Sequence, residues 1–409
     1  MKNHTLALLG MLVVVLMALA LAAPASADEE GNVLRVGPGQ EYETIQAAVD
    51  AAQPGSRILV YSRSRVYPER YEESVTVTTN NLQIIAQGSN VTVSPPVAKP
   101  GFDVNADHVT VRGFEISGAV CAPGITFQGS HNTFADNTIW FFQGPCDPTA
   151  IRCVDPDGGS DYNTIESNSL SGAAGTGLIY GIFVSASSDA LNEGNVIKNN
   201  SIVDVDSLGI YVGNGTGFQI SGNTFEHIHI GDCILVEASN NAHQGHHRIL
   251  KNKMFSCAGA GISLYALPGT VLANNRISAN EINTCGQDCL ALKAGSGAAL
   301  TQNYVMSNTV GASLSANGVY LSADQDAAVN DNMILDNVVY GNFIDGISLS
   351  AGSDHNRILN NEVDTNHNVG VAIAGDNNLI VGNHIWNNKV SDLEDTGVNN
   401  RWYNNTVSD

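Results

Sequence analysis

Apolar and polar residues alternate over short stretches of this chain, and no helical spacing appears between the stretches. One eight-residue phrase recurs: an Asn or small residue, an apolar residue two positions later, a second Asn, and a final apolar residue. Residues 132–139, 163–170, 356–363 and 378–385 follow it. Counting along the chain, we place the second Asn at 137, 168, 200, 223, 252, 275, 303, 332, 361, 383 and 405. Each repeat is therefore 22 to 32 residues long.

A second phrase, out of phase with the first, begins with a small residue and continues apolar, any residue, apolar. Gly opens it at Gly124, Gly181, Gly209, Gly261, Gly318 and Gly346. Cys233 and Cys289 take the place of Gly in two coils. Alternation with a period of two predicts short strands that bury one face. Each repeat then holds about three such strands.

Repeats of this length that contain only strands predict an all-β fold, a single-stranded right-handed parallel β-helix of about 12 coils. Residues in one slot of successive coils stack in columns. A column of Asn has a physical reason, because Asn tolerates the left-handed backbone of a tight turn and its amide can bond the amide of the next coil.

The first sheet edges of such a stack need a cover. Residues 44–53 predict a capping helix that starts at Thr44 and is stopped by the Pro-Gly pair at 54–55. Its apolar face consists of Ile45, Ala48, Val49 and Ala52.

The beginning of the chain has the features of an exported protein. Lys2 precedes an almost unbroken apolar run over residues 6–21, and residues 25–27 read Ala-Ser-Ala, a cleavage-site pattern. We therefore expect a signal peptide at 1–27, the cap helix and first coils at 28–100, and the β-helix repeats at 101–409. The mature product is expected to be secreted, extracellular or periplasmic, with no membrane segment.

Residues 36–52, from Val-Gly-Pro-Gly-Gln to Val-Asp-Ala-Ala, and the stretch Arg-Ile-Leu-Val-Tyr at 57–61 resemble the start of pectate-lyase-like β-helix proteins. The Asn-rich coils resemble the generic repeats of carbohydrate-binding and sugar-hydrolase β-helices and of NosD-type periplasmic proteins. The resemblance extends over nearly the whole mature chain. It implies the fold and an action on polysaccharide, but its motifs do not specify a reaction.

One local match is narrower. Residues 286–295, Gly-Gln-Asp-Cys-Leu-Ala-Leu-Lys-Ala-Gly, resemble the Gly-Asp-Asp-Cys-Ile-Ala-Leu-Lys-Ser-Gly phrase of polygalacturonase-type hydrolases. Asp288 matches the second Asp of that phrase, but Gln287 stands where the first Asp is expected. The family's other segments are absent, and a similar phrase follows Asp232, which favours a feature of the repeat over a hydrolase site.

The chain has 18 basic and 40 acidic residues, a net charge of −22. Nucleic-acid binding needs a cationic surface and is excluded. A polyuronate would be repelled from most of this surface, so a site for one requires a local basic patch or bound divalent cations.

Seven Cys in an exported chain predict disulfides. Cys257 and Cys285 each lie four residues before a strand start, so they stack in adjacent coils, and we predict a Cys257–Cys285 bond. The same reasoning predicts Cys121–Cys146. Cys153 falls on an inward position and is expected to be a small buried hydrophobe.

The candidate site residues come from repeat positions whose side chains are expected to point outward. Four residues after the strand starts, Glu237, Tyr265 and Lys293 occupy one slot in three consecutive coils. Asp232 and Asp288 occupy the slot before the strand start. Tyr211 and Tyr320 lie two residues after the strand starts of coils on either side.

This set suits uronate chemistry, which needs a base at C5, a proton donor and a cation for the carboxylate. Lys293 or Tyr265 could be base and acid, while Arg276 or a calcium ion neutralises the sugar carboxylate. Hydrolysis would use two carboxylates, and Asp232 and Asp288 are expected to be about 9.6 Å apart from the strand spacing. The alternative is that all of these are ordinary solvated residues of a sheet face.

Histidines are concentrated after Glu237. His243, His246 and His247 lie in one loop and could bind zinc or copper, although no usual metal-ligand spacing is present. They could equally act in a sugar site. No cofactor is required by the sequence, and calcium is a further candidate.

Two functions remain open. The first is a secreted lyase, epimerase or glycoside hydrolase that acts on a uronate-containing glycan in an outer-face groove. The second is a non-catalytic carbohydrate-binding, adhesive or NosD-type metal-delivery scaffold. The expected partner is a polysaccharide, with no nucleic acid and no membrane, and the expected state is a monomer.

Overall fold

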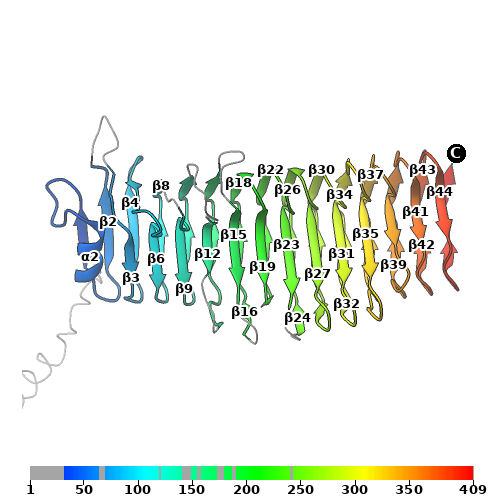
Figure 1. The fold of residues 1–409 in the computed structure, drawn as a ribbon, viewed down its shortest axis with the longest axis horizontal. Coiled ribbons are helices and arrows are strands. Elements are labelled where there is room, and N and C mark those ends of the chain that lie inside the picture. The colour runs from blue at the N-terminus through cyan, green and yellow to red at the C-terminus, as the bar shows by residue number, and fades with distance from the viewer. Residues whose placement is uncertain are drawn as a thin grey trace, which may run out of the picture.

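The structure is a computed structural model that describes residues 32–63, 70–118, 121–140, 149–153, 158–172, 179–186, 190–239 and 243–408. The predicted signal peptide at 1–27 lies outside these residues. The chain winds as a right-handed parallel β-helix whose coils stack along one axis from the N-terminal to the C-terminal end (Figure 1). The predicted fold is confirmed. Two of its sheets have 13 strands, close to the expected number of coils.

Three long parallel sheets run along the axis, and the chain passes through them in the order sheet A, sheet B, sheet C in each coil. The 15 strands of sheet A are β1 (Val33–Val36), β2 (Arg57–Tyr61), β4 (Gln83–Gln87), β7 (Thr110–Arg112), β10 (Thr133–Ala135), β13 (Thr164–Glu166), β17 (Val196–Lys198), β21 (Gln219–Ser221), β25 (Arg248–Leu250), β29 (Arg276–Ser278), β33 (Tyr304–Met306), β36 (Met333–Leu335), β39 (Arg357–Leu359), β42 (Leu379–Val381) and β45 (Arg401–Tyr403).

Sheet B follows sheet A after a short turn. Its 13 strands are β5 (Thr92–Val93), β8 (Glu115–Ser117), β11 (Thr138–Trp140), β14 (Ser169–Ser171), β18 (Ser201–Val205), β22 (Thr224–Ile228), β26 (Lys253–Cys257), β30 (Glu281–Cys285), β34 (Thr309–Gly311), β37 (Val338–Tyr340), β40 (Glu362–Asp364), β43 (His384–Trp386) and β46 (Thr406–Ser408).

Sheet C completes each coil. Its 13 strands are β3 (Val75–Val77), β6 (Phe102–Asn105), β9 (Ile125–Gln128), β12 (Thr149–Cys153), β15 (Tyr180–Ser185), β19 (Leu208–Gly213), β23 (Ile234–Ala238), β27 (Ile262–Ala266), β31 (Leu290–Ala294), β35 (Val319–Ala323), β38 (Ile347–Leu349), β41 (Val369–Ile373) and β44 (Ser391–Asp395). A short fourth sheet lies between C and A in the middle coils: β16 (Asn192–Glu193), β20 (Gly215–Thr216), β24 (His243–Gly245), β28 (Val271–Ala273) and β32 (Ala299–Thr301).

The core is a set of apolar columns inside the coils. In sheet A the central residue of each short strand points inward, so Ile277, Val305 and Ile334 stack directly on one another and are fully buried. Because neighbouring coils bury each other's apolar residues, the repeated pattern stabilises the whole stack and not a single coil.

The Asn residues form two columns, one for each Asn slot of the phrase, where a single column was predicted. The Oδ1 of each Asn accepts the backbone N–H of the residue one coil earlier. The first Asn column holds 132, 163, 195, 275, 303, 332, 356, 378 and 400, and the second holds 137, 168, 200, 223, 252, 280, 308, 337, 361, 383 and 405.

Two parts of the Asn prediction were therefore wrong. The prediction put Asn275, Asn303 and Asn332 of the first column together with Asn252 of the second column. The two columns are only five residues apart in each coil, so counting along the sequence confused them. The left-handed backbone belongs to the residue before an Asn of either column, such as Gln302 or Lys251, and not to the Asn itself. The predicted amide–amide stacking is confirmed.

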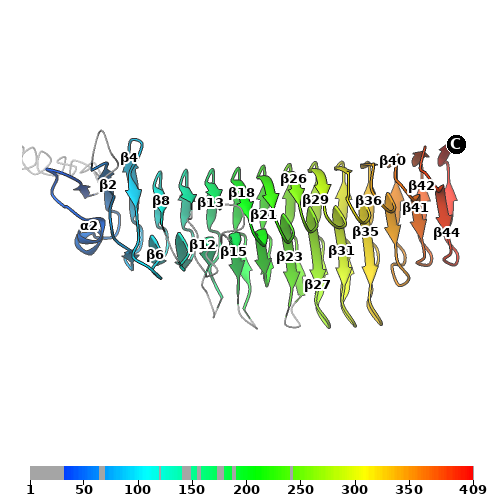
Figure 2. The ribbon, with the colours of Figure 1, turned by 45° about the horizontal axis from the view of Figure 1, so that its top comes forward.

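The predicted N-terminal cap is confirmed as α2 (Ile45–Ala51), which contacts β1, β2 and β3 at one end of the stack (Figure 2). The Thr44 side chain accepts the backbone N–H of Ala47, and Ile45, Ala48 and Val49 are buried. The carboxylate of Glu73 accepts the first two backbone N–H groups of the helix, from Ile45 and Gln46. A carboxylate there satisfies donors that the helix leaves unpaired.

The disulfides differ from the prediction. Cys257 and Cys285 do stack in adjacent coils, yet Cys257 bonds Cys233 and Cys285 bonds Cys289. The Cα separations are 5.7 and 5.3 Å. Both bonds cross the corner between sheets B and C, where a Cys before the corner meets a Cys after it. The predicted Cys257–Cys285 bond is wrong because register alone does not decide which neighbour a thiol faces.

The other cysteines agree with the sequence where they are described. Cys121 is disulfide-bonded, but its predicted partner Cys146 lies outside the described residues. Cys153 is buried, as expected from its inward position. Within the part of the chain that the structure describes, no helix is both long and apolar enough to cross a membrane.

Candidate functional site

Sheet C brings three of the predicted residues together on its outer face. Glu237 on β23 lies beside Tyr265 on β27, which lies beside Lys293 on β31. The expectation that they occupy one slot in consecutive coils is confirmed. All three side chains are partly exposed. An acid, a phenol and an amine therefore form a continuous row along the axis.

A second row, two residues earlier in the strands, carries aromatic rings in the coils that precede Glu237. The Phe183 and Tyr211 rings stack with centroids 4.8 Å apart, and the Arg152 guanidinium lies 5.2 Å from the Phe183 centroid. Tyr180, which the slot pattern missed because it opens β15, packs against Phe183 at 5.2 Å. Stacked rings in contact with a cation form a preorganised flat surface.

Tyr211 joins the two rows. Its hydroxyl donates to Glu237 Oε1 at 2.9 Å. Burial raises the pKa of Tyr211, and the charge of Glu237 and the hydrogen bond to it add to that effect. Tyr211 is therefore a neutral donor that orients the Glu237 carboxylate, and it is not a base.

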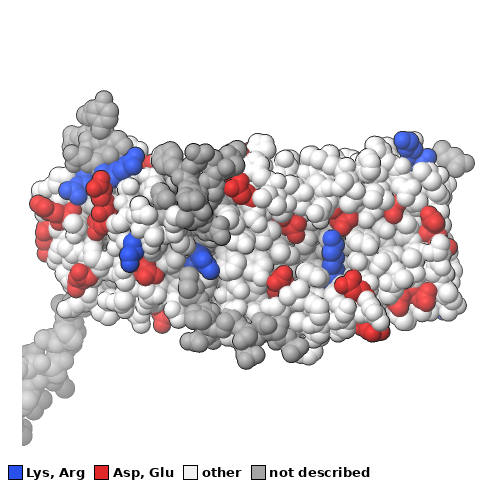
Figure 3. Space-filling view, in the orientation of Figure 1, with Lys and Arg blue, Asp and Glu red and all other residues white. Residues whose placement is uncertain are grey.

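Lys293 connects the row to one of the predicted carboxylates. Its Nζ lies 3.1 Å from Asp288 Oδ2 and 6.0 Å from the centroid of the Tyr320 ring. The Asp288 side chain is only 8% exposed, whereas that of Lys293 is 35% exposed. The cation is thus held by a buried carboxylate and is still open to solvent. Figure 3 shows that charged side chains on this face are sparse, with basic residues set among acidic ones.

The carboxylates of Asp232 and Asp288, which the sequence predicted as site residues, accept backbone N–H groups of the next coil. Asp288 Oδ1 accepts the N–H and the side-chain amide of Asn317, at 3.1 and 2.9 Å. Asp232 Oδ1 accepts the N–H of Ala260 at 2.7 Å, and Asp345 does the same for Val369. Burial raises the pKa of Asp232 despite this hydrogen bond. The column is therefore chiefly structural. Asp288 also forms an ion pair with Lys293 of the site, and the charge of Lys293 acts on Asp232 as well.

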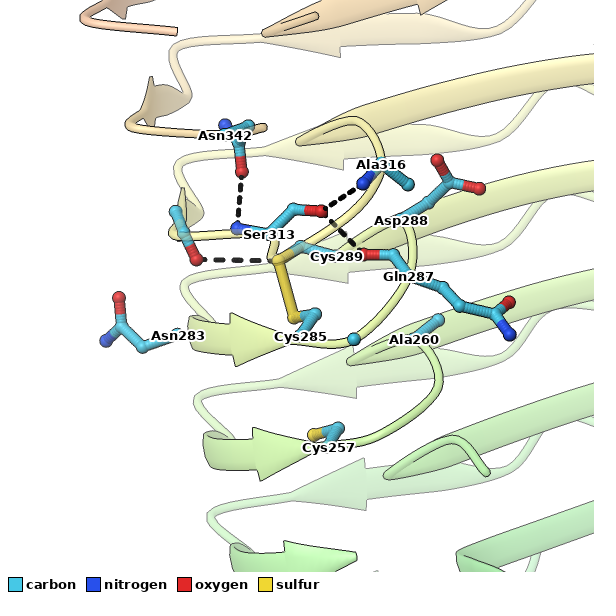
Figure 4. Close-up of a disulfide and its surroundings, with 12 residues drawn as sticks. Cys257, Ala260, Asn283, Cys285, Gln287, Asp288, Cys289, Ser313, Ala316 and Asn342 are labelled. Carbon is cyan, nitrogen blue, oxygen red and sulfur yellow. Dashed lines mark hydrogen bonds between the residues drawn. A yellow bond between two sulfur atoms is a disulfide. The ribbon is translucent and has the colours of Figure 1, made fainter. Parts of the chain in front are cut away.

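The polygalacturonase-like phrase contributes to the same corner. Cys289 is tied to Cys285, and the backbone carbonyl of Gln287 accepts the Ser313 hydroxyl at 2.8 Å. In Figure 4 the side chains of Gln287 and Asp288 point away from the disulfide. The disulfide thus anchors the turn from which Asp288 reaches Lys293.

Arg276 was placed wrongly. It lies on β29 of sheet A, next to Arg248 and Tyr304, and not on the sheet C face with Lys293. A different sheet faces a different side of the coil, so Arg276 cannot neutralise a sugar bound to Lys293. Tyr320, by contrast, is close to Lys293 as expected.

The predicted histidine site is not assembled. His243 is exposed on β24, while His247 is fully buried and takes one position of the first Asn column. The imidazole Nδ1 of His247 accepts the backbone N–H of Phe218 at 3.3 Å. The backbone N–H of His247 donates to Asn275 Oδ1. Over the described ranges no three His, Cys, Asp or Glu side chains form a group that could hold a metal ion. His247 is a core residue, and its proposed role as a ligand is wrong.

Buried His247 makes the fold sensitive to acid. Burial lowers the pKa of His247 to about 3, whereas an unfolded His titrates near 6.5. The unfolded chain therefore binds a proton that the folded chain excludes, and the stability is lost as the pH falls below about 6.5. Between pH 6.5 and 5 we expect wild type to lose about 2 kcal/mol from this residue.

Replacing His247 by Asn, the residue found in the same column in neighbouring coils, should remove this acid sensitivity. Urea unfolding at pH 7.5 and pH 5, followed by circular dichroism, measures the effect. The exposed His243→Asn variant is the control and should behave as wild type. An equal loss of stability on acidification in the His247→Asn protein and in wild type would refute the assignment.

Comparison with known proteins agrees with this architecture. The family model described as "Right handed beta helix region" matches residues 76–243 and 179–327, more than half of the chain. The chain therefore belongs to the right-handed β-helix family. Among the curated proteins, none matches the sequence.

Several solved structures share the fold at low identity. The Dettilon tailspike protein aligns with a TM-score of 0.54 and 12% identity over 86% of this chain, which spans 64% of the tailspike chain. A PL6 family polysaccharide lyase from Pseudopedobacter saltans gives 0.52 and 12%, with 92% of each chain covered. The A-module of an Azotobacter vinelandii mannuronan C-5 epimerase gives 0.51 and 13%, over 85% of this chain and 94% of the module. At this identity the likeness shows the fold alone.

Proposed function

We propose that this protein acts on a uronate-containing polysaccharide along the outer face of sheet C. The observation that carries the proposal is the row of Glu237, Tyr265 and Lys293 beside the stacked Phe183 and Tyr211 rings. Aromatic faces pack against the C–H faces of sugar rings, and a partly exposed cation binds a sugar carboxylate. Two structural relatives are a polysaccharide lyase and a mannuronan epimerase, which supports the substrate class.

The geometry suggests a division of roles. With Arg276 on another sheet, Lys293 is the cation in the same row as Glu237 and Tyr265 that can neutralise the sugar carboxylate, and Asp288 holds it in place. Glu237, as a carboxylate, then accepts the C5 proton, and the neighbouring Tyr265 phenol donates a proton to the leaving oxygen in elimination or back to C5 in epimerisation. Loss of the C5 proton is the first step of both elimination and epimerisation. A calcium ion at the substrate carboxylate would serve the same purpose as Lys293.

A hydrolase is less well supported by this arrangement. Retaining or inverting hydrolysis needs two carboxyl groups that both reach the glycosidic bond. Here Asp232 and Asp288 each use one carboxylate oxygen to accept a backbone N–H of the next coil. The other oxygen of Asp288 contacts Lys293. The non-catalytic alternative is favoured by the mutual contacts of Arg152, Phe183 and Tyr211, which would bind a sugar without any chemistry.

Export fits this function, since a polysaccharide is met outside the cell. The disulfides among the described residues support an oxidising compartment. The apolar N-terminal run with its Ala-Ser-Ala pattern supports a cleaved signal peptide.

The test is incubation of the mature protein with polyuronates and neutral glycans, with and without calcium. Unsaturated uronates report elimination, new reducing ends without unsaturated uronates report hydrolysis, and solvent deuterium at C5 without chain cleavage reports epimerisation. We expect the Lys293→Ala/Tyr265→Phe double variant to lose activity roughly tenfold or more, because it lacks both the cation and the phenol.

The matched control is Lys253→Ala/Tyr403→Phe, which makes the same two changes on sheets B and A. It should keep wild-type activity. Activity that survives in the Lys293 and Tyr265 variant would exclude this face as the site. Binding to one glycan without turnover of any would support the non-catalytic alternative.

A further inference from the structure

The outer face of sheet A carries a pocket that the function proposed above does not use. Arg248, Lys251 and Arg276 line it together with Leu250 and Met306, and its volume is about 280 Å³. The remaining lining residues are Ser278, Ala279 and Ser307. Among the described residues, no carboxylate lines this pocket, although acidic residues outnumber basic ones 40 to 18 in the chain.

The three cations are unpaired as far as the structure describes the chain. None of them forms an ion pair there, whereas two other basic residues of sheet A do: Arg112 with Asp136 at 2.6 Å and Lys198 with Glu166 at 2.7 Å. Arg248 and Arg276 are direct neighbours in adjacent strands. Like charges opposite one another in a sheet are destabilising, and a bound anion would relieve the repulsion.

The surroundings of the cations suit a sugar and not only a small anion. Tyr304 follows Arg276 in the same column of sheet A and is 46% exposed. Leu250 and Met306 add a partly buried apolar floor. An arginine pair binds a carboxylate through parallel N–H bonds, while a phenol ring and an apolar floor pack against a pyranose.

We propose that this pocket is a second glycan site, which binds the carboxylate of an acidic sugar residue on a face separate from the sheet C row. The ligand class rests on the proposed function, since the same polysaccharide would supply the carboxylate. The pocket also provides the local positive charge that a polyanion needs in order to approach a protein with a net charge of −22. It would hold the polymer while the sheet C face acts on another part of it.

The test is titration calorimetry with a short oligogalacturonate in the Lys293→Ala/Tyr265→Phe background, which removes the cation and the phenol of the sheet C row. Adding Arg248→Gln and Arg276→Gln should weaken binding roughly tenfold or more, because the charge-assisted bonds are lost. Arg112→Gln is the matched control. It removes the same charge from the same sheet at a residue already paired with Asp136, and it should leave the affinity unchanged.

The outcomes separate this inference from the proposed function. Unchanged oligogalacturonate binding after the two Arg substitutions would overturn the second site, whatever the activity of the sheet C face. Binding of inorganic phosphate or of the methyl-esterified oligomer as tightly as of the oligogalacturonate would overturn the assignment to a sugar carboxylate. Tenfold weaker binding together with full activity in the Lys293 and Tyr265 variant would support the second site and refute the proposed function.

Discussion

The Asn252→Ala variant is expected to lose about 3 kcal/mol of unfolding free energy, because buried backbone groups are left without partners. Asn252 is fully buried, and its Oδ1 accepts the backbone N–H of Asn223 at 2.9 Å. Its Nδ2 donates to the Ile220 carbonyl and to Asn280 Oδ1, both at 3.0 Å. Alanine cannot replace any of these bonds, and water cannot reach the site.

Urea unfolding followed by circular dichroism measures this loss. Asn105→Ala is the control, since Asn105 is exposed on β6, and a surface substitution of this kind should change stability by less than about 0.5 kcal/mol. A midpoint for Asn252→Ala that coincides with that of Asn105→Ala would show that the column does not stabilise the stack.

Gly261→Ala should destabilise the fold by a similar amount, about 3 kcal/mol, because the added methyl group has no space. A Cβ at Gly261 would lie 2.2 Å from Ile282 Cγ2 and 2.8 Å from the carbonyl oxygen of Cys289. The first is a branched core side chain and the second is backbone, so neither can move away easily. The same crowding explains why the strand starts of sheet C are so often Gly.

The comparison for this variant is Gly297→Ala. Nothing lies within 4 Å of a Cβ at Gly297, and its φ of +67° leaves only the backbone cost of a left-handed Ala, about 1 kcal/mol. Both variants are compared with wild type in thermal and urea unfolding. If Gly261→Ala were no less stable than Gly297→Ala, steric crowding at the strand start would not be the reason why Gly recurs at this position in successive coils.

Within single strands, the sequence predicted the candidate site well. Glu237, Tyr265 and Lys293 each lie four residues after a strand start with no turn between, so strand pairing fixes them side by side. The aromatic neighbours Tyr211 and Tyr320 were found by the same count. What the count could not show is that Tyr211 donates to Glu237 and that Asp288 holds Lys293.

Predictions that crossed a turn were less accurate. Arg276 precedes Lys293 by one strand of sheet B and two turns, and it faces another side of the coil. His247 follows a loop after Glu237, yet it is a member of the buried Asn column. The Cys257–Cys285 prediction had the right register and the wrong bond, since the corner between sheets B and C turns each thiol toward a different neighbour.

The sequence by itself determined the architecture, because alternation with a period of two and a recurring Asn slot are local features that every coil repeats. A stack of such coils buries its apolar residues in only one way, and the cap at 44–53 follows from the same logic. Only the tertiary structure decided which polar residues share a face. Turn lengths differ from coil to coil, so the direction of a side chain after a turn depends on packing against neighbouring coils and not on distance along the chain.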